Sequence, residues 1–240
     1  MKLYHVGPDK DPLHGSREAA KVAIALRETG ADFEIEYLNR IRDMRPPAGF
    51  YKTKINPMGT VPALEDDGFL LLESGAIMRY LAEKYPDANL LPDDPQQRAK
   101  AMQWLMWEAT TFCLALCNLC MVQPVKEMDA PAFESIYPFR TKDPEQSRLE
   151  RQLGQEQMAH RLGVFDKALD GQRYIANDSY SIADIALGTH VALAGLVEFD
   201  LKPFANISAW LCRLEDKQAW QQEDVFTGDM QLIREKNLLT

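Results

Sequence analysis

Hydrophobic residues recur with two different periods along the first third of the chain. Residues 2–6 (KLYHV) have the composition of a β-strand, and residues 32–38 (DFEIEYL) alternate apolar with acidic side chains as a strand does. Between them, residues 16–29 repeat apolar side chains at helical spacing, and Gly30 follows as a typical helix stop. The pattern therefore predicts a β-α-β opening.

Two more strands and a helix complete this unit. Residues 60–64 (TVPAL) and 68–74 (GFLLLES) are predicted strands joined by the tight turn EDDG. Residues 75–85 (GAIMRYLAEKY) have the pattern of an amphipathic helix, whereas residues 46–59, rich in proline and glycine, are expected to be irregular. We therefore predict a compact α/β domain over residues 1–83.

The pattern changes after residues 84–95, a proline-rich segment that is predicted to be a linker. Beyond it apolar residues recur at helical spacing without strand patterns, which predicts an all-α domain over residues 96–240. The predicted helices are residues 96–123, 148–170, 181–196 and 206–218. Residues 124–146 contain four prolines and form either an exposed loop or a lid.

Composition and charge exclude several classes of function. The 240 residues are 46% hydrophobic and 26% charged, which is an ordinary globular balance. The net charge is −9 and no long basic stripe is present, so neither nucleic acid nor an anionic membrane surface is an expected partner. The most apolar later stretch, residues 182–199, is interrupted by Asp184 and His190 and is too short to span a membrane. With no secretory signal at the start, we expect a cytoplasmic protein.

Three of the four cysteines share one face of a predicted helix. Cys113, Cys117 and Cys120 are spaced i, i+4 and i+7, inside an apolar stretch. A redox C-x-x-C pair needs a helix N-terminus to acidify its thiol, and a zinc site needs a fourth ligand, which the spacing does not supply. We therefore predict buried, reduced thiols and no metal.

One motif points to a known family. Asn56-Pro57-Met58-Gly59 precedes TVPAL, and Glu73-Ser74 ends the following strand. This arrangement resembles the glutathione-binding signature of cytosolic glutathione S-transferases, and within that family the chain resembles bacterial members that use a serine to activate the thiol. The resemblance covers nearly the whole chain. It implies a thioredoxin-like domain followed by an all-helical domain, with glutathione as co-substrate and no metal.

The resemblance also assigns roles to individual residues. Pro62 would be cis, and the backbone of Val61 would pair with glutathione as an added strand. Ser74 is expected to cap a helix and to hold the γ-glutamyl carboxylate there, while Glu73 would meet the α-ammonium group. Lys54 would meet the glycyl carboxylate, although a plain surface role is an equal alternative.

The residue that activates the glutathione thiol is expected just after the first strand. Ser16 falls where serine-type classes of the family place it, although the loop before it, GPDKDPLHG, is longer than usual. Plain helix capping, activation by a backbone amide and the absence of thiol chemistry are the alternatives. Tyr4, His5 and His14 are weaker candidates.

The remaining expectations concern the second substrate and the structural motifs. Trp107 and Thr111 would line an apolar site for a small hydrophobic electrophile between the two domains. In the stretch SIADIAL, Ser181 and Asp184 have the spacing of a capping box, which we assign to folding. The resemblance implies a homodimeric transferase. Cleavage of an ether or halide, disulfide reduction and a non-catalytic binding module are the alternatives.

Overall fold

The computed structural model describes residues 1–7, 15–40, 42–44, 49–122, 143–176 and 178–239, without the side chains of residues 117, 118, 121 and 122. Its N-terminal part has the order β-α-β-α-β-β-α. The elements are β1 (Lys2–His5), α1 (Arg17–Thr29), β2 (Glu34–Tyr37), α2 (Phe50–Lys54), β3 (Ala63–Asp66), β4 (Phe69–Leu72) and α3 (Ser74–Lys84).

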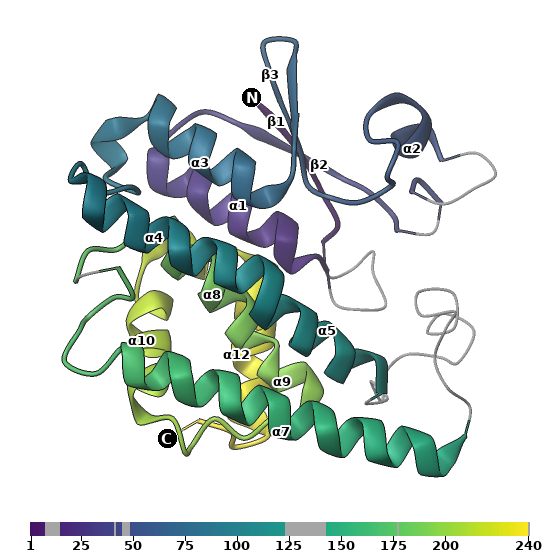
Figure 1. Cartoon of the computed structure of the whole chain (residues 1–240). Coiled ribbons are helices and arrows are strands. Elements are labelled where there is room, and N and C mark those ends of the chain that lie inside the picture. The colour runs from purple at the N-terminus through teal and green to yellow at the C-terminus, as the bar shows by residue number, and fades with distance from the viewer. Residues whose placement is uncertain (8–14, 41, 45–48, 123–142, 177, 240) are drawn as a thin grey trace.

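The four strands form one mixed sheet in the order β2-β1-β3-β4. Strand β1 runs parallel to β2 and antiparallel to β3, and β4 is antiparallel to β3. Helices α1 and α3 lie together between this sheet and the helical part, whereas α2 lies to the side (Figure 1). This arrangement confirms the predicted thioredoxin-like fold of the first domain.

The rest of the described chain is helical, as predicted. A short 3₁₀ turn, η2 (Pro86–Ala88), lies between α3 and the first long helix, within the predicted linker. The helical elements are α4 (Pro95–Trp107), the π-helical turn η3 (Glu108–Phe112), α5 (Cys113–Val122), α7 (Pro144–Ala168), α8 (Ile182–Ala192), α9 (Ala194–Val197), α10 (Ala205–Glu215), α11 (Gln218–Gln221) and α12 (Asp224–Glu235). No helix among the described residues is both long enough and apolar enough to cross a membrane.

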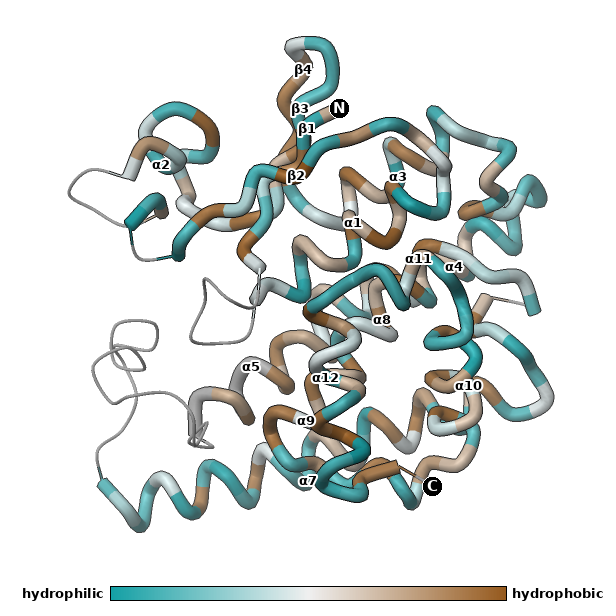
Figure 2. Tube along the Cα trace, turned by 180° about the vertical axis from the view of Figure 1, so that it is seen from behind, coloured by the Kyte–Doolittle hydropathy of each residue, from teal (hydrophilic) through white to brown (hydrophobic). Residues whose placement is uncertain are grey.

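Some sequence predictions need correction. Residues 50–54 form helix α2 inside the segment expected to be irregular, and helix α12 was not predicted. The stretch 96–123 is not one uniform helix, because η3 interrupts it. Along α7, the apolar side chains of Leu149 and Leu153 are exposed rather than packed in the core, in a projecting half of the helix that is mainly hydrophilic (Figure 2).

The predicted capping box of α8 is confirmed. The Asp184 carboxylate accepts a hydrogen bond from the Ser181 amide at 3.0 Å, and the Ser181 hydroxyl accepts from the Ala183 amide at 3.3 Å. The same carboxylate accepts from the amide of Ile175 at 3.0 Å and from the indole N–H of Trp210 at 2.9 Å. Ser181 and Asp184 therefore join three segments of the helical domain, consistent with a role in folding.

One hydrophobic core runs through both domains. It contains α1 and α3 residues such as Val22 and Met78 together with α8, α10 and α12 residues such as Ile185 and Trp210. A smaller cluster, which includes Tyr4 and Tyr51, lies elsewhere in the first domain. Helix α1 buries nine of its 13 residues, because it is covered by the first domain on one side and by the helical domain on the other.

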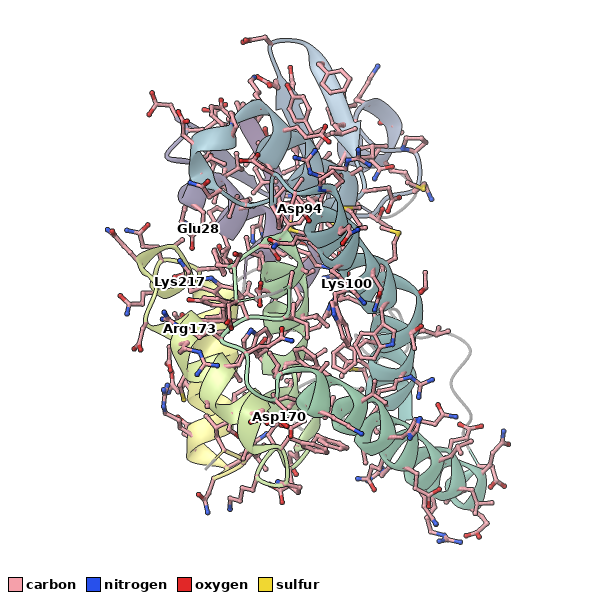
Figure 3. All side chains as sticks on the ribbon, turned by 60° about the vertical axis from the view of Figure 1, so that its left-hand side comes forward. Glu28, Asp94, Lys100, Asp170, Arg173 and Lys217 are labelled. Atoms are coloured by element: carbon pink, nitrogen blue, oxygen red, sulfur yellow. The ribbon has the colours of Figure 1, made fainter. Side chains whose placement is uncertain are left out.

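Ion pairs add to this contact between the domains. The Nε of Arg17 donates to Asp229 of α12 at 2.9 Å, and Arg27 Nη1 donates to Glu223 at 2.7 Å. Lys217, just before α11, reaches Glu28 of α1 at 3.3 Å, and Figure 3 shows the two labelled side chains close together. The two domains are therefore joined by charged as well as apolar contacts.

Candidate functional site

The sheet topology brings the predicted glutathione-binding residues to one end of the sheet. Because β1 is antiparallel to β3 and β4 is antiparallel to β3, the C-terminal ends of β1 and β4 lie beside the start of β3. The N-termini of α1 and α3 lie at the same end (Figure 1). Helix N-termini present free backbone N–H groups and partial positive charge, so this end of the sheet suits an anionic ligand.

Ser16 lies at the start of α1 and caps it. Its backbone is extended, its hydroxyl oxygen accepts from the Ala19 amide at 3.3 Å, and its own amide donates to the carbonyl of Val6 at 3.0 Å. A hydroxyl that accepts one hydrogen bond still has a proton to donate. Among the described residues that proton has no acceptor. Residues 8–14, which include most of the long loop and His14, lie outside the described residues.

Two of the weaker thiol-activating candidates, Tyr4 and His5, lie among the described residues, and each contacts a carboxylate. The Tyr4 hydroxyl donates to Glu65 at 3.4 Å, and the buried ring of His5 lies 3.2 Å from Glu223 through Nε2. Both side chains are nearly inaccessible to solvent. Among the described candidates, Ser16 is therefore the one with a hydroxyl proton that has no acceptor, although the buried Nδ1 of His5 also has no hydrogen-bond partner.

The segment before β3 is shaped to leave the backbone of Val61 open. The Val61–Pro62 peptide bond is cis. The preceding carbonyl, that of Thr60, accepts from the Tyr51 hydroxyl at 2.8 Å and from the Asn56 side chain at 2.7 Å. Within the described part of the chain, neither the N–H nor the C=O of Val61 has a hydrogen-bond partner. An extended peptide is the kind of ligand that pairs with such a backbone.

Glu73 and Ser74 lie at the start of α3, but the predicted cap needs correction. Glu73 occupies the capping position with φ +68 and makes no side-chain cap bond, and Ser74 is the first helical residue. The Ser74 hydroxyl donates to the carboxylate of Glu18 in α1. Ser74 therefore connects the N-terminus of α3 to α1, and the backbone N–H groups of the first turn of α3 remain available to an anion.

Lys54 lies in α2, and the two predicted electrophile-lining residues, Trp107 and Thr111, lie in α4 and η3 of the helical domain. Lys54 is an exposed side chain in the last turn of α2. The half-buried ring of Trp107 stacks on Phe112 with centroids 5.5 Å apart and also approaches Phe165 of α7. The Thr111 carbonyl accepts from Arg161 of α7 at 3.1 Å. A lining role for Trp107 and Thr111 stays a prediction, as does the role of residues 124–146, most of which lie outside the described residues.

A charged cluster at the domain interface was not predicted. Lys21 of α1 lies 2.8 Å from Glu18 and 3.2 Å from Glu108 of η3. His190 of α8 pairs with Glu108 through Nδ1, and its Nε2 lies 3.3 Å from Glu18. The Sγ of Cys113 completes the group at 3.8 Å from His190 Nε2. We call these five residues the interface cluster.

Four members of the interface cluster, Glu18, Lys21, Glu108 and His190, are held in their charged forms. Burial alone would raise the pKa of Glu18 and Glu108, but Lys21 and His190 outweigh it and lower both values, that of Glu18 strongly. Burial and Lys21 act to lower the pKa of His190, but the Glu108 carboxylate overcomes them and raises it well above its usual value. Two carboxylates therefore face two cations at the interface between the domains.

The π-helical turn explains how one helix supplies two members of the cluster. In a regular α-helix, residues five apart point about 140° away from each other. In η3 the amide of Cys113 donates to the carbonyl of Glu108, which is the i to i+5 bond of a π-helix. That wider turn places Glu108 and Cys113 on the same side, toward α1 and α8. Cys113 is thus half-buried beside charges, not in an apolar core as predicted.

A sequence signal for this cluster existed. Lys21, Glu108 and His190 each interrupt an otherwise apolar helical stretch, and charges on an apolar helix face are seldom buried unless they are paired. Their partners are distant in the sequence, so the pairing itself could not be deduced from spacing.

The chain matches two family models. Residues 13–89 match the model "Glutathione S-transferase, N-terminal domain", and residues 128–217 match "Glutathione S-transferase, C-terminal domain".

Individual relatives extend this likeness over nearly the whole chain. "Glutathione S-transferase D7" of Drosophila melanogaster is 31% identical over 233 residues, covering 93% of each chain. A solved delta-class glutathione transferase of Nilaparvata lugens is 26% identical with a TM-score of 0.72, covering 98% of this chain and 99% of that one. A glutathione transferase of Pseudomonas putida, solved with one glutathione disulfide per subunit, is also 26% identical with a TM-score of 0.72, over 93% and 90%.

Proposed function

We propose that this chain, a member of the glutathione S-transferase family, binds glutathione at the end of the sheet where β1, β3 and β4 meet and activates its thiol for attack on small hydrophobic electrophiles. The family makes the chain a glutathione transferase enzyme. The convergence of the open Val61 backbone and the N-termini of α1 and α3 at one end of the sheet supports this placement of the peptide.

The two ends of the tripeptide would be held by charge. The γ-glutamyl carboxylate accepts from the hydroxyl of Ser74 and from backbone N–H groups of the first turn of α3, and the helix dipole favours it there. The carboxylate of Glu73 meets the α-ammonium group. Lys54, whose side chain is exposed, reaches the glycyl carboxylate.

The middle of the tripeptide would be held by main chain. The cysteinyl residue of glutathione pairs with the N–H and C=O of Val61 as an added strand, in the position that the cis Pro62 leaves open. Pairing through backbone groups depends little on the side chain of Val61. We expect this pairing with Val61 to direct the cysteinyl sulfur toward the start of α1.

Ser16 would then stabilise the thiolate. A free thiol has a pKa of about 8.5, so most of it is protonated at neutral pH. A hydroxyl that donates to the sulfur anion, beside a helix N-terminus, lowers that pKa. The thiolate attacks an electrophilic carbon with its electron pair, and the leaving group departs with the pair of the broken bond. Capping by the Ser16 oxygen and donation by its proton are compatible roles.

Disulfide reduction on the same site is the second candidate. It is favoured by the glutathione disulfide bound in the Pseudomonas putida relative. In this reaction the glutathione thiolate would attack one sulfur of a disulfide substrate, and the other sulfur would leave as a thiolate. The mixed disulfide that results would be resolved by a second glutathione. The homodimer, the cytoplasmic location and the electrophile-lining roles of Trp107 and Thr111 remain predictions.

Calorimetric titration with glutathione, followed by a conjugation assay with an aryl halide, tests the proposal. We expect saturable binding and glutathione-dependent conjugation, with binding weakened by about tenfold in Ser74→Ala, since a hydrogen bond to a charged group is lost. Ser147→Ala, on α7, is the matched control. A wild-type protein without measurable glutathione binding would refute the site, and a Ser74→Ala variant that binds normally would refute the role of that hydroxyl.

A further inference from the structure

Three side chains of the interface cluster present metal-ligating atoms to one point. Glu18 Oε1 lies 3.3 Å from His190 Nε2, and Cys113 Sγ lies 3.8 Å from His190 Nε2 and 4.0 Å from Glu18 Oε1. A point equidistant from these three atoms lies about 2.2 Å from each, which matches zinc–ligand distances of roughly 2.0–2.3 Å. A cation seated there, or slightly above the triangle, would contact all three without rearrangement of the backbone.

We propose that Glu18, Cys113 and His190 form a zinc site between the two domains. The ligands come from α1, from the start of α5 and from α8, so no local spacing in the sequence reveals them. The prediction of no metal is based on the spacing of the cysteines and does not include Glu18 and His190 as ligands. The cation would have three protein ligands and a fourth position for water, since the side chain of Glu18 is 37% exposed.

The groups behind the ligands are those that a metal site requires. The Nδ1 of His190 is in ion-pair contact with the carboxylate of Glu108, which leaves Nε2 as the coordinating atom, and zinc-bound histidines commonly have a carboxylate on this side of the ring. The second oxygen of Glu18 is held by Ser74 and by Lys21. Both polar ligands are therefore oriented by a second partner, and their coordinating atoms point toward Cys113.

The charge balance also permits a cation. Without metal, the negative charges of Glu18 and Glu108 match the positive charges of Lys21 and protonated His190. Coordination needs a neutral imidazole and a thiolate, so binding releases one proton from His190 and one from Cys113. Two protons leave as one divalent cation enters, and the net charge of the cluster is unchanged.

The ligand types select the metal. A thiolate and an imidazole favour zinc over magnesium or calcium, which prefer oxygen ligands and higher coordination numbers. The site would link the first domain, through Glu18, to the helical domain, through Cys113 and His190. It adds a direct bond between elements that are otherwise joined by packing and ion pairs.

Titration of the full-length, reduced, chelator-stripped protein with Co²⁺, without glutathione, tests this site. We expect about one cobalt ion per chain with a thiolate-to-cobalt absorption band, and displacement of the cobalt by Zn²⁺. Cys113→Ser should lose the band, while Cys212→Ser, which alters a half-buried cysteine of α10, should keep it. Glu108→Gln should keep the band and weaken binding by about 10–100-fold, because it alters the partner of His190.

Two outcomes overturn the proposal. One is a wild-type protein that shows no cobalt–thiolate band at stoichiometric metal, which would leave the cluster as ion pairs alone. The other is a Cys113→Ser variant that retains the band. Because a variant can fail to fold, alkylation of Cys113 in the wild-type chain, followed by mass spectrometry, gives an independent readout. Bound zinc should slow that alkylation at least tenfold, and an unchanged rate would refute the site. None of these measurements depends on glutathione binding.

Discussion

The carboxylate of Glu18 accepts a hydrogen bond from the hydroxyl of Ser74, so a negative charge from α1 lies in contact with the first turn of α3. Ser74 is also the residue proposed to hold the γ-glutamyl carboxylate. A bound carboxylate would therefore compete with Glu18 for one hydroxyl proton and would be repelled by its charge.

Replacing this charge should strengthen glutathione binding. We expect Glu18→Gln to lower the Kd of glutathione by about threefold to tenfold, since the repulsion disappears while Lys21 and His190 stay positive. Calorimetry in the presence of a chelator measures the change. Glu34→Gln, an exposed carboxylate on β2, should leave the Kd unaltered. An unchanged or higher Kd in Glu18→Gln would show that Glu18 does not oppose the ligand.

Removing the Ser16 hydroxyl should affect both chemistry and stability. In Ser16→Ala we expect the pKa of the bound glutathione thiol to rise toward its free value of about 8.5, because the donor to sulfur is lost. The loss of the helix cap should cost about 1 kcal/mol of unfolding free energy. Ultraviolet titration of the thiolate and urea unfolding measure the two effects. Ser16→Thr should restore both, and an unaltered thiol pKa in Ser16→Ala would place activation elsewhere.

Two helical glycines should respond in opposite ways to alanine. A Cβ at Gly188 of α8 would lie 2.6 Å from Cδ1 of Leu214 and 2.9 Å from Cζ3 of Trp220, and closer still to Cη2 of that ring, and both side chains are buried. We expect Gly188→Ala to lower the unfolding free energy by about 1–3 kcal/mol through overpacking. At Gly163 of α7 nothing lies within 4 Å of such a Cβ, so Gly163→Ala should raise it by about 0.5–1 kcal/mol. Urea unfolding distinguishes the signs, and a tolerated Gly188→Ala would mean that the α8 contact is looser than described.

The buried carboxylate of Glu223 should make stability depend on pH. Burial acts to raise the pKa of Glu223, but His5 and Arg27 outweigh it, so the pKa lies below its usual value of 4.5. The stabilisation is therefore present above pH 4.5 and is lost as pH falls through the lowered pKa. Glu223→Gln should cost about 2–4 kcal/mol at pH 7, and the cost should shrink as pH falls below 4.5.

Urea unfolding at pH 7 and at pH 4 and below measures this difference between the two proteins. Glu83→Gln, which alters an exposed pair with Arg79, should change the unfolding free energy by less than about 0.5 kcal/mol at both pH values. A penalty for Glu223→Gln that stays constant with pH would mean that protonation of Glu223 does not contribute to acid unfolding.

Local patterns were sufficient for much of the fold. The alternation in residues 32–38, the helical spacing after Ser16 and the turn before Phe69 predict elements that the structure contains. Helix α12 was missed although its buried residues, among them Phe226, Met230 and Ile233, follow helical spacing. Helix α2 was missed for a different reason, because five residues between prolines and glycines are too few to show a period.

The site divides in the same way. Residues joined by a short motif, such as Val61 with Pro62 or Glu73 with Ser74, could be predicted together because the sequence places them together. Glu18 and His190 are 172 positions apart, and only the packing of α1 against α8 brings them within 3.3 Å. The π-helical turn could not be predicted from the sequence either, since the residues of η3 are compatible with an ordinary α-helix.

The burial of α1 on two sides should determine how the protein unfolds. A helix that completes the interior of both domains cannot be detached from either without exposing apolar surface. Although the chain matches two separate family models, it should melt as a single cooperative unit, with no species in which one half is native and the other is denatured. Residues 1–83 expressed by themselves would present the bare face of α1 to water and would be prone to aggregate.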